Sequence, residues 1–128
     1  MPCKGAFQAH GQAAPTESKL SDLQRLLPAL EQLRTELTDP PTIAQLAQRC
    51  SLSESQFRRV FRRAVGLLPV QYQRRMRMEN ACRQLRQTND TVEAIAVAVG
   101  YAETAFFAHT FKRLMGVSPG KYRLAESL

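Results

Sequence analysis

Two stretches of this chain carry the same pattern: residues 57–72 read FRRVFRRAVGLLPVQY, and residues 107–122 read FAHTFKRLMGVSPGKY. Both hold two phenylalanines four residues apart, then two basic residues, a glycine, a proline and a tyrosine. Upstream, TIAQLA at residues 42–47 matches TVEAIA at residues 91–96. The upstream segments are 49 residues apart and the downstream segments are 50 apart. The second copy therefore carries one extra residue between its upstream and its downstream segment. Such self-similarity indicates a duplicated unit of secondary structure.

Local signals predict a short helix, a tight turn and a second helix in each copy. Thr42 with Gln45, and Ser53 with Gln56, have the spacing of capping boxes, which open helices. Thr91 takes the opening position of the second copy. No stretch alternates at period two, so we expect no sheet. The predicted helices cover residues 27–37, 42–49, 53–65, 69–86, 91 up to a turn at 100, 103–115, and 119 onward.

Leucines recur at helical spacing before the first copy, at positions 20, 23, 27, 30, 33 and 37. Proline fits the first turn of a helix but not its interior, so Pro28 predicts a helix from about Leu27 to Leu37. The stripe could form a dimer seam, but Arg34 interrupts it, and we favour packing onto the following helices. We expect three parts: a disordered tail or linker at 1–19, a first helix-turn-helix subdomain with a linker helix at 20–86, and a second subdomain at 87–128.

Positive charge is concentrated in one part of the chain, whose net charge is +7. Residues 49–86 hold ten arginines and no lysine against Glu54 and Glu79, a net +8, whereas residues 1–48 carry −1 and residues 87–128 are neutral. Arginine makes paired hydrogen bonds to phosphate or guanine. The stripe therefore favours a nucleic-acid partner over a merely solubilising surface.

A helical wheel separates two faces on the second helix of the first copy. Phe57, Phe61 and Ala64 lie inward. The outer face and its flanks hold Ser55, Gln56, Arg58, Arg59, Arg62 and Arg63. In a helix that enters a groove, residues near the start reach base edges and later residues meet phosphates.

The second copy presents fewer hydrogen-bonding groups at the same place. Phe107, Phe111 and Leu114 lie inward, and the outer face and its margins hold Thr104, Ala105, Phe106, His109, Lys112 and Arg113. Phe106 could contact thymine methyl groups or cap the small core, and we favour the core. His109 could donate to a base edge or be an ordinary surface histidine.

Several classes of protein are disfavoured. No run of about 18 apolar residues is present, and the start lacks the apolar segment of a secretory signal, so we expect a cytoplasmic protein without a membrane partner. Cys3 and Cys82 as nucleophiles would need a base, and His10 and His109 form no recognisable catalytic or metal-binding arrangement with them. We expect no enzyme activity, no metal and no cofactor.

The chain resembles the AraC/XylS family of bacterial transcription regulators over about residues 20–126. The resemblance is carried by Ile95-Ala96-x-x-Val99-Gly100-Tyr101, Phe107-x-x-x-Phe111-Lys112-Arg113, Gly116-x-Ser118-Pro119-x-x-Tyr122-Arg123 and, in the long helix, Arg77-x-x-x-Ala81-x-x-x-Leu85. It implies an all-α fold of about seven helices, with two helix-turn-helix subdomains joined by a long linker helix.

The resemblance also implies a sequence-specific regulator of double-stranded DNA. Its two recognition helices would read successive major grooves, and it would be an activator that contacts RNA polymerase at the bacterial nucleoid. By position, the base-reading residues are Ser55, Gln56, Arg58, Arg59, Thr104, Ala105, Phe106, Ala108 and His109. The residues expected at phosphates are Thr42, Arg62, Arg63, Arg74, Thr91, Lys112 and Arg113. An architectural protein that bends DNA with little sequence preference is the alternative.

Two departures from the family pattern shape these expectations. Many members have Ser-x-x-x-Arg where this chain has Ala105 and His109, so we predict that base reading is concentrated in the first copy. Most members also carry an amino-terminal effector-binding or dimerisation domain, for which residues 1–40 are too few. We expect either a small stand-alone regulator or the carboxy-terminal part of a longer one, which could form a homodimer through that domain.

Overall fold

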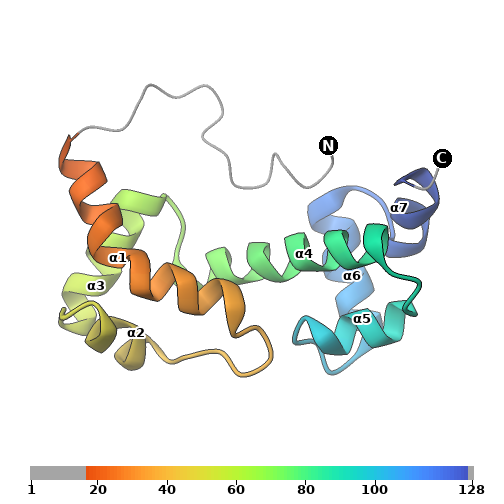
Figure 1. Cartoon of the computed structure of the whole chain (residues 1–128), viewed down its shortest axis with the longest axis horizontal. Coiled ribbons are helices and arrows are strands. Elements are labelled where there is room, and N and C mark those ends of the chain that lie inside the picture. Colours follow the sequence, from red (N-terminus) through yellow and green to blue (C-terminus); the bar gives the residue numbers. More distant parts are fainter. Residues whose placement is uncertain (1–16, 127–128) are drawn as a thin grey trace. The chain divides into compact units, whose positions relative to one another are not determined.

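The computed structural model describes residues 17–126, and over this range every regular element is an α-helix (Figure 1). The all-α prediction with about seven helices is therefore confirmed, while most of the expected tail at residues 1–19 lies outside the described residues. The contacts divide the described chain into two compact units, residues 17–74 and 75–126. The helices are α1 (Glu17–Thr35), α2 (Ile43–Arg49), α3 (Glu54–Val65), α4 (Pro69–Gln87), α5 (Val92–Ala98), α6 (Thr104–Met115) and α7 (Pro119–Glu126).

Helix α1 differs from the prediction at both ends. It begins about ten residues before Leu27, keeps Pro28 in its interior and ends before Leu37. Its buried side chains recur every three or four residues, at Asp22, Leu26, Ala29 and Leu33. This face packs on α2 and α3. Pro28 has no N–H, so the helix lacks one backbone hydrogen bond to the preceding turn. The burial of this face compensates for that loss.

The leucine stripe is used for packing only in part. Leu33 and Leu37 are buried as predicted, but Leu20 and Leu27 expose 49% and 57% of their surface. The buried line passes through Leu26 instead. One residue along a helix turns the side chain by about 100°, so the choice between Leu26 and Leu27 decides which face meets the core.

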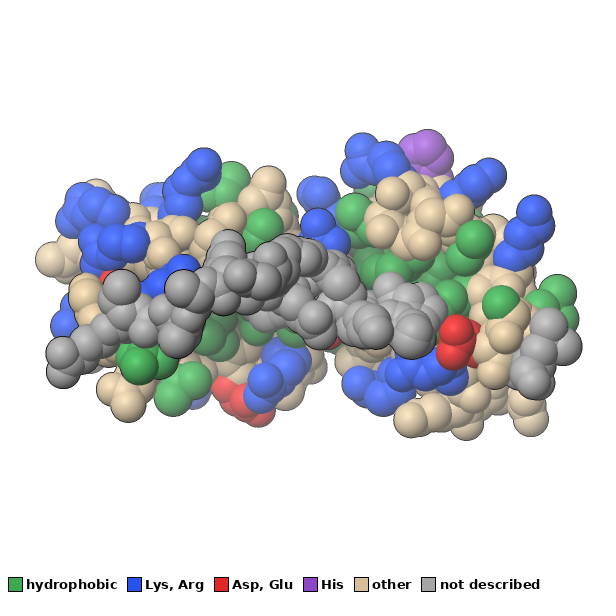
Figure 2. Space-filling view, turned by 90° about the horizontal axis from the view of Figure 1, so that it is seen from above, with side chains coloured by type: hydrophobic (Ala, Val, Ile, Leu, Met, Phe, Trp, Pro, Cys, Tyr) green, Lys and Arg blue, Asp and Glu red, His purple; other side chains and the backbone are tan. Residues whose placement is uncertain are grey.

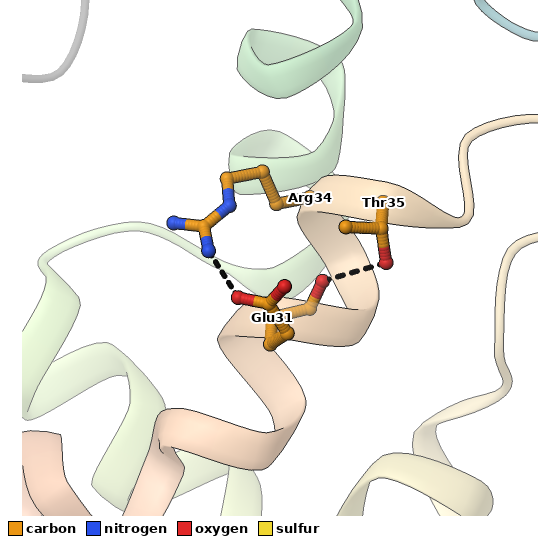
Figure 3. A network of polar contacts seen from close by, with 3 residues as sticks. All are labelled: Glu31, Arg34 and Thr35. Atoms are coloured by element: carbon orange, nitrogen blue, oxygen red, sulfur yellow. Dashed lines mark hydrogen bonds and ion pairs between the residues drawn. The ribbon is translucent and has the colours of Figure 1, made fainter.

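A small polar network holds the end of α1 (Figure 3). Arg34 forms an ion pair with Glu31 one turn earlier, and the Thr35 hydroxyl donates to the Glu31 carbonyl at 2.9 Å. These groups are exposed, so the ion pair contributes only a few tenths of a kcal/mol. The network therefore lies at the end of the helix but contributes little to the packing of α1 on its neighbours.

Both capping boxes predicted in the first unit are present. The Thr42 and Ser53 hydroxyls each accept a backbone N–H from three residues ahead at 3.1 Å. In return, Gln45 and Gln56 each accept the N–H of their capping residue through Oε1, at 2.9 and 3.1 Å. Helices α2 and α3 therefore begin where the local sequence predicts.

The turn between the two helices is built alike in both units. Leu52 and Tyr101 take the same place, because each donates its N–H to the carbonyl five residues earlier, at 2.9 and 2.8 Å. In the first unit the capping residue Ser53 follows directly. In the second, Ala102 stands between Tyr101 and the capping residue Glu103. Ala102 is thus the extra residue that the change of offset predicts.

Three aromatic rings form the centre of each unit. In the first they are Phe57, Phe61 and Tyr72, with successive ring centroids 5.5 and 5.8 Å apart. In the second they are Phe107, Phe111 and Tyr122, with successive centroids 5.8 and 5.7 Å apart. Each tyrosine meets its phenylalanine edge to face, an arrangement that aromatic quadrupoles favour. The repeated aromatic residues are therefore core residues.

The amino end of α7 is capped by a hydroxyl, and its next turn fastens the end of α4. The Ser118 hydroxyl accepts the backbone N–H of Lys121 at 3.2 Å, directly before the predicted helix start at residue 119. Arg123 donates through Nε to the Leu85 carbonyl at 3.1 Å and through Nη2 to the Thr88 carbonyl at 3.2 Å. The last carbonyls of a helix lack partners within it, so Arg123 supplies donors that α4 cannot.

Candidate nucleic-acid interface

Helix α3 presents a polar face opposite its core face. Phe57, Val60, Phe61 and Ala64 are buried. The six positions predicted to point outward are all exposed: Ser55, Gln56, Arg58, Arg59, Arg62 and Arg63. Glycine ends the helix, because Gly66 takes a left-handed conformation (φ 84°) that a residue with a β-carbon rarely adopts. Helix α3 is thus amphipathic, and four arginines lie on its exposed face.

Two of the outward residues already have partners on α3 or at its cap. Gln56 uses its Oε1 in the capping box with Ser53, which leaves its Nε2 as the group able to donate to a base. Arg58 lies 3.7 Å from the Glu54 carboxylate one turn earlier, and both side chains are more than half exposed. Such an exposed pair is weak, so Arg58 can exchange Glu54 for a stronger acceptor.

Arg63 has a partner that the helical wheel does not reveal. Its Nε and Nη2 lie 3.0 and 2.9 Å from Oδ2 of Asp22 on α1. The Asp22 side chain is only 10% exposed, whereas that of Arg63 is 56% exposed. Arg63 therefore links α1 to α3 and keeps a buried carboxylate paired, and its half-exposed guanidinium has further N–H groups beyond the two that meet Asp22.

Arg59 and Arg62 differ from these neighbours. Both are exposed, and within residues 17–126 neither side chain makes a hydrogen bond or an ion pair. Arg74, at the sixth position of α4, is half-buried. An arginine side chain without an internal partner can reach an anion without breaking an existing contact. Among the four outward arginines of α3, this holds for Arg59 and Arg62.

Helix α6 repeats the layout with a different surface. Phe107, Thr110 and Phe111 are buried, and Ala105, His109, Lys112 and Arg113 are exposed as predicted. Thr104 and Ala108 are half-buried. Phe106 does not close the core in the way we expected, since 60% of its surface is exposed, although its ring centroid lies 5.6 Å from that of Tyr101.

The caps of the two short helices carry the remaining predicted contact residues. Thr42 and Thr91 are exposed, and each accepts a backbone N–H in the first turn, at 3.1 Å on α2 and 3.0 Å on α5. An anion approaching these turns would therefore meet a hydroxyl together with backbone N–H groups. The structure brings these elements together within each unit, α2 with α3 and α5 with α6.

Some arginines of residues 49–86 make contacts within the protein. The Arg77 guanidinium lies 5.4 Å from the centre of the Tyr101 ring, Arg86 donates to the Tyr122 hydroxyl at 2.7 Å, and Arg83 donates to Asn80 at 2.9 Å. A count of charges along the sequence does not separate such arginines from those on α3. Lysine and arginine side chains still lie on the surfaces of both units (Figure 2).

Among the described residues, burial shifts the pKa of one thiol and one carboxyl group. Burial raises the pKa of the Cys50 thiol, against smaller opposing effects of a hydrogen bond to Ala29 and the charge of Arg49. Burial likewise raises the pKa of Glu79, opposed by Arg75. Among the described residues, no three side chains of His, Cys, Asp or Glu are placed to hold a metal ion. No described helix is long and apolar enough to cross a membrane.

Comparison with known proteins identifies this arrangement. A family model described as a helix-turn-helix domain matches residues 46–125. A transcriptional regulator with an AraC-type DNA-binding domain from Chromobacterium violaceum has the same fold, with a TM-score of 0.78 at 21% identity over 84% of this chain and 96% of that one. The chain belongs to the AraC/XylS family of helix-turn-helix DNA-binding regulators. The family predicted from the sequence is thereby confirmed.

Three further proteins to which this chain is similar show how much of a regulator it covers. An HTH-type transcriptional regulator of Mycobacterium tuberculosis is 45% identical over 65% of this chain but only 32% of its own length. The transcriptional activator AarP of Providencia stuartii is 34% identical over 71% of this chain and 67% of its own length. The DNA-binding domain of AdpA, solved with a target DNA, is 29% identical with a TM-score of 0.66, over 81% of this chain and 90% of that one. The chain thus spans about a third of the first of these relatives.

Proposed function

We propose that this AraC/XylS-family chain binds double-stranded DNA in a sequence-specific manner and regulates transcription in the bacterial cytoplasm. The single observation that carries the proposal is the exposed face of α3, where the side chains of Arg59 and Arg62 have no partner among residues 17–126. The AdpA complex supports it, because that related domain was solved with its target DNA.

Each unit has a distinct part in the proposed complex. Arg59, Arg58 and the Nε2 of Gln56 read base edges in one major groove, and Ser55 lies beside them at the helix start. Arg62, Arg63 and Arg74, with the cap of α2 at Thr42, contact phosphates. In the second unit, α6 enters the next groove with Thr104, Ala105, Phe106, Ala108 and His109, and the phosphates meet Lys112, Arg113 and the cap of α5 at Thr91.

Regulation is proposed to be activation through contact with RNA polymerase. Support comes from AarP, a protein named as an activator, two thirds of which this chain covers. The selected binding site is placed upstream of a reporter promoter. Expression of the chain should then raise transcription of the reporter. Lower transcription from that promoter would make the chain a repressor.

Selection of bound sequences from a random DNA pool tests the proposal. A specific reader should prefer the selected duplex over random duplex by about a thousandfold or more at physiological salt. A preference of only a few fold would instead support an architectural protein that bends DNA.

Single-base variants of the selected duplex then locate the reading residues. Arg59→Ala should remove about 1–3 kcal/mol of discrimination at one position, because a paired arginine–guanine contact is lost. His109→Ala should relax specificity less, and a larger effect of His109→Ala would reverse the ranking of the two units. Arg62→Ala is the matched control: it removes an arginine from the same face, one turn on, and should weaken binding to all variants alike.

A further inference from the structure

Helix α6 begins with an apolar surface where α3 is polar. Its outward positions in the first turn and a half hold Ala105, Phe106 and Ala108. The three corresponding positions of α3, 50 residues earlier, hold Ser55, Gln56 and Arg58. Ala105 is exposed, and Phe106 exposes 60% of its surface. The hydroxyl of Thr104 is on a half-buried residue, so the exposed start of α6 has little with which to bond a base edge.

The exposed Phe106 ring is held in place from behind. Its centroid lies 5.6 Å from that of Tyr101, with the ring planes at 53°. Tyr101 is buried, rests on Phe107 at 5.5 Å, and has the Arg77 guanidinium 5.4 Å from its ring centre. A side chain fixed in this way loses little conformational freedom when a ligand covers it. Phe106 is therefore a preformed apolar contact surface on a helix proposed to enter a groove.

We propose that α6 recognises thymine through its C5-methyl group, with Phe106 as the contacting side chain and Ala105 beside it. This inference rests on the proposed DNA-binding function. The thymine methyl is the apolar group that base edges present in the major groove, and alanine and phenylalanine are side chains that contact it. Arg58 and Arg59 on α3 can donate hydrogen bonds to the acceptors of guanine. The two halves of the site would thus be read by different chemistry.

Removal of the methyl group alone tests the inference. Each thymine of the selected duplex is replaced singly by deoxyuridine, which keeps O4 and the base pair but lacks the C5-methyl. At one or two thymines in the half read by α6, the wild-type chain should bind about three- to fourfold more weakly per methyl removed, the value of one buried methylene group. Equal binding of the thymine and uracil duplexes, or a selected site without thymine in that half, overturns the inference.

Protein variants assign the methyl contact to Phe106. Phe106→Ala should bind the thymine duplex more weakly and lose the difference between thymine and uracil, whereas Phe106→Leu should keep part of it. Val97→Ala is the matched control, since Val97 is another exposed apolar residue of this unit (61%) and lies on α5; it should keep the full difference. A full thymine preference in Phe106→Ala would contradict the assignment. Should Phe106→Ala prove unfolded by circular dichroism, the wild-type comparison with uracil decides alone.

The same experiment separates this inference from the proposed function. A chain that shows no preference for any selected duplex over random DNA contradicts the proposed function, and the thymine inference fails with it. A chain that prefers its selected site and tolerates uracil everywhere contradicts the thymine inference only.

Discussion

The Asp22–Arg63 pair shows how one arginine of the basic stripe serves the fold. The Asp22 side chain, on α1, is only 10% exposed, and it is contacted by the half-exposed side chain of Arg63 on α3. A buried carboxylate needs a partner, because the loss of hydration is costly. Arg63 supplies two N–H groups to one oxygen. The role of Arg63 is thus first to join two helices, and phosphate contact is a proposed second role.

Arg63→Ala should therefore destabilise the chain. We expect a loss of about 1–2 kcal/mol of unfolding free energy, between the values for exposed pairs and for fully buried ones, because one partner is half exposed. Urea denaturation followed by circular dichroism measures it. Arg62→Ala is the matched control: its side chain is exposed on the same helix without a partner, so its stability should stay within about 0.5 kcal/mol of wild type. Equal stability of the two variants would show that the pair contributes nothing.

At the scale of the element, the position of α3 depends on its cap. Ser53 and Gln56 form a reciprocal pair of hydrogen bonds that satisfies two backbone N–H groups at the start of the helix. The same Gln56 is proposed to face a base, so its side chain has both a structural and a recognition role. In α6 the corresponding cap residue, Glu103, makes no side-chain cap bond.

Ser53→Ala should cost about 1 kcal/mol of stability, the usual value for the loss of a capping hydroxyl. The urea midpoint should fall with an unchanged slope, since the same surface is exposed on unfolding. Ser55→Ala, two residues later on the exposed side of α3, is the control and should leave stability nearly unchanged. A larger loss from Ser55→Ala would place the helix start elsewhere.

Element boundaries could be predicted from the sequence wherever the cause is local. The caps at Thr42 and Ser53 and the helix end at Gly66 depend on residues within one turn, and all three are confirmed. Helix α1 was predicted wrongly because packing against α3 outweighs the local effect of Pro28. The same limit applies to the candidate site: exposure of α3 follows from periodicity, but the partner of Arg63 lies 41 residues away in sequence.

Residues 42–122 contain a tandem repeat, and this has a consequence for the proposed DNA site. The two copies follow one another in the chain, and their second helices, which are the proposed recognition helices, differ in surface: α3 carries arginines, and α6 carries Phe106 and His109. A two-fold symmetric site would suit two identical helices related by a dimer axis. Tandem copies with unlike surfaces suit a site whose halves differ in sequence.

We therefore predict that one molecule protects two DNA segments about 10 base pairs apart, centre to centre, with a non-palindromic sequence. Hydroxyl-radical footprinting on the selected duplex, at a protein concentration where sedimentation shows a monomer, measures the spacing. Arg59→Ala should weaken protection mainly in one segment and Lys112→Ala mainly in the other, because each residue belongs to one recognition helix. A strict palindrome, with both segments weakened equally by Arg59→Ala, would instead mean that two molecules bind and that each engages one half-site through α3.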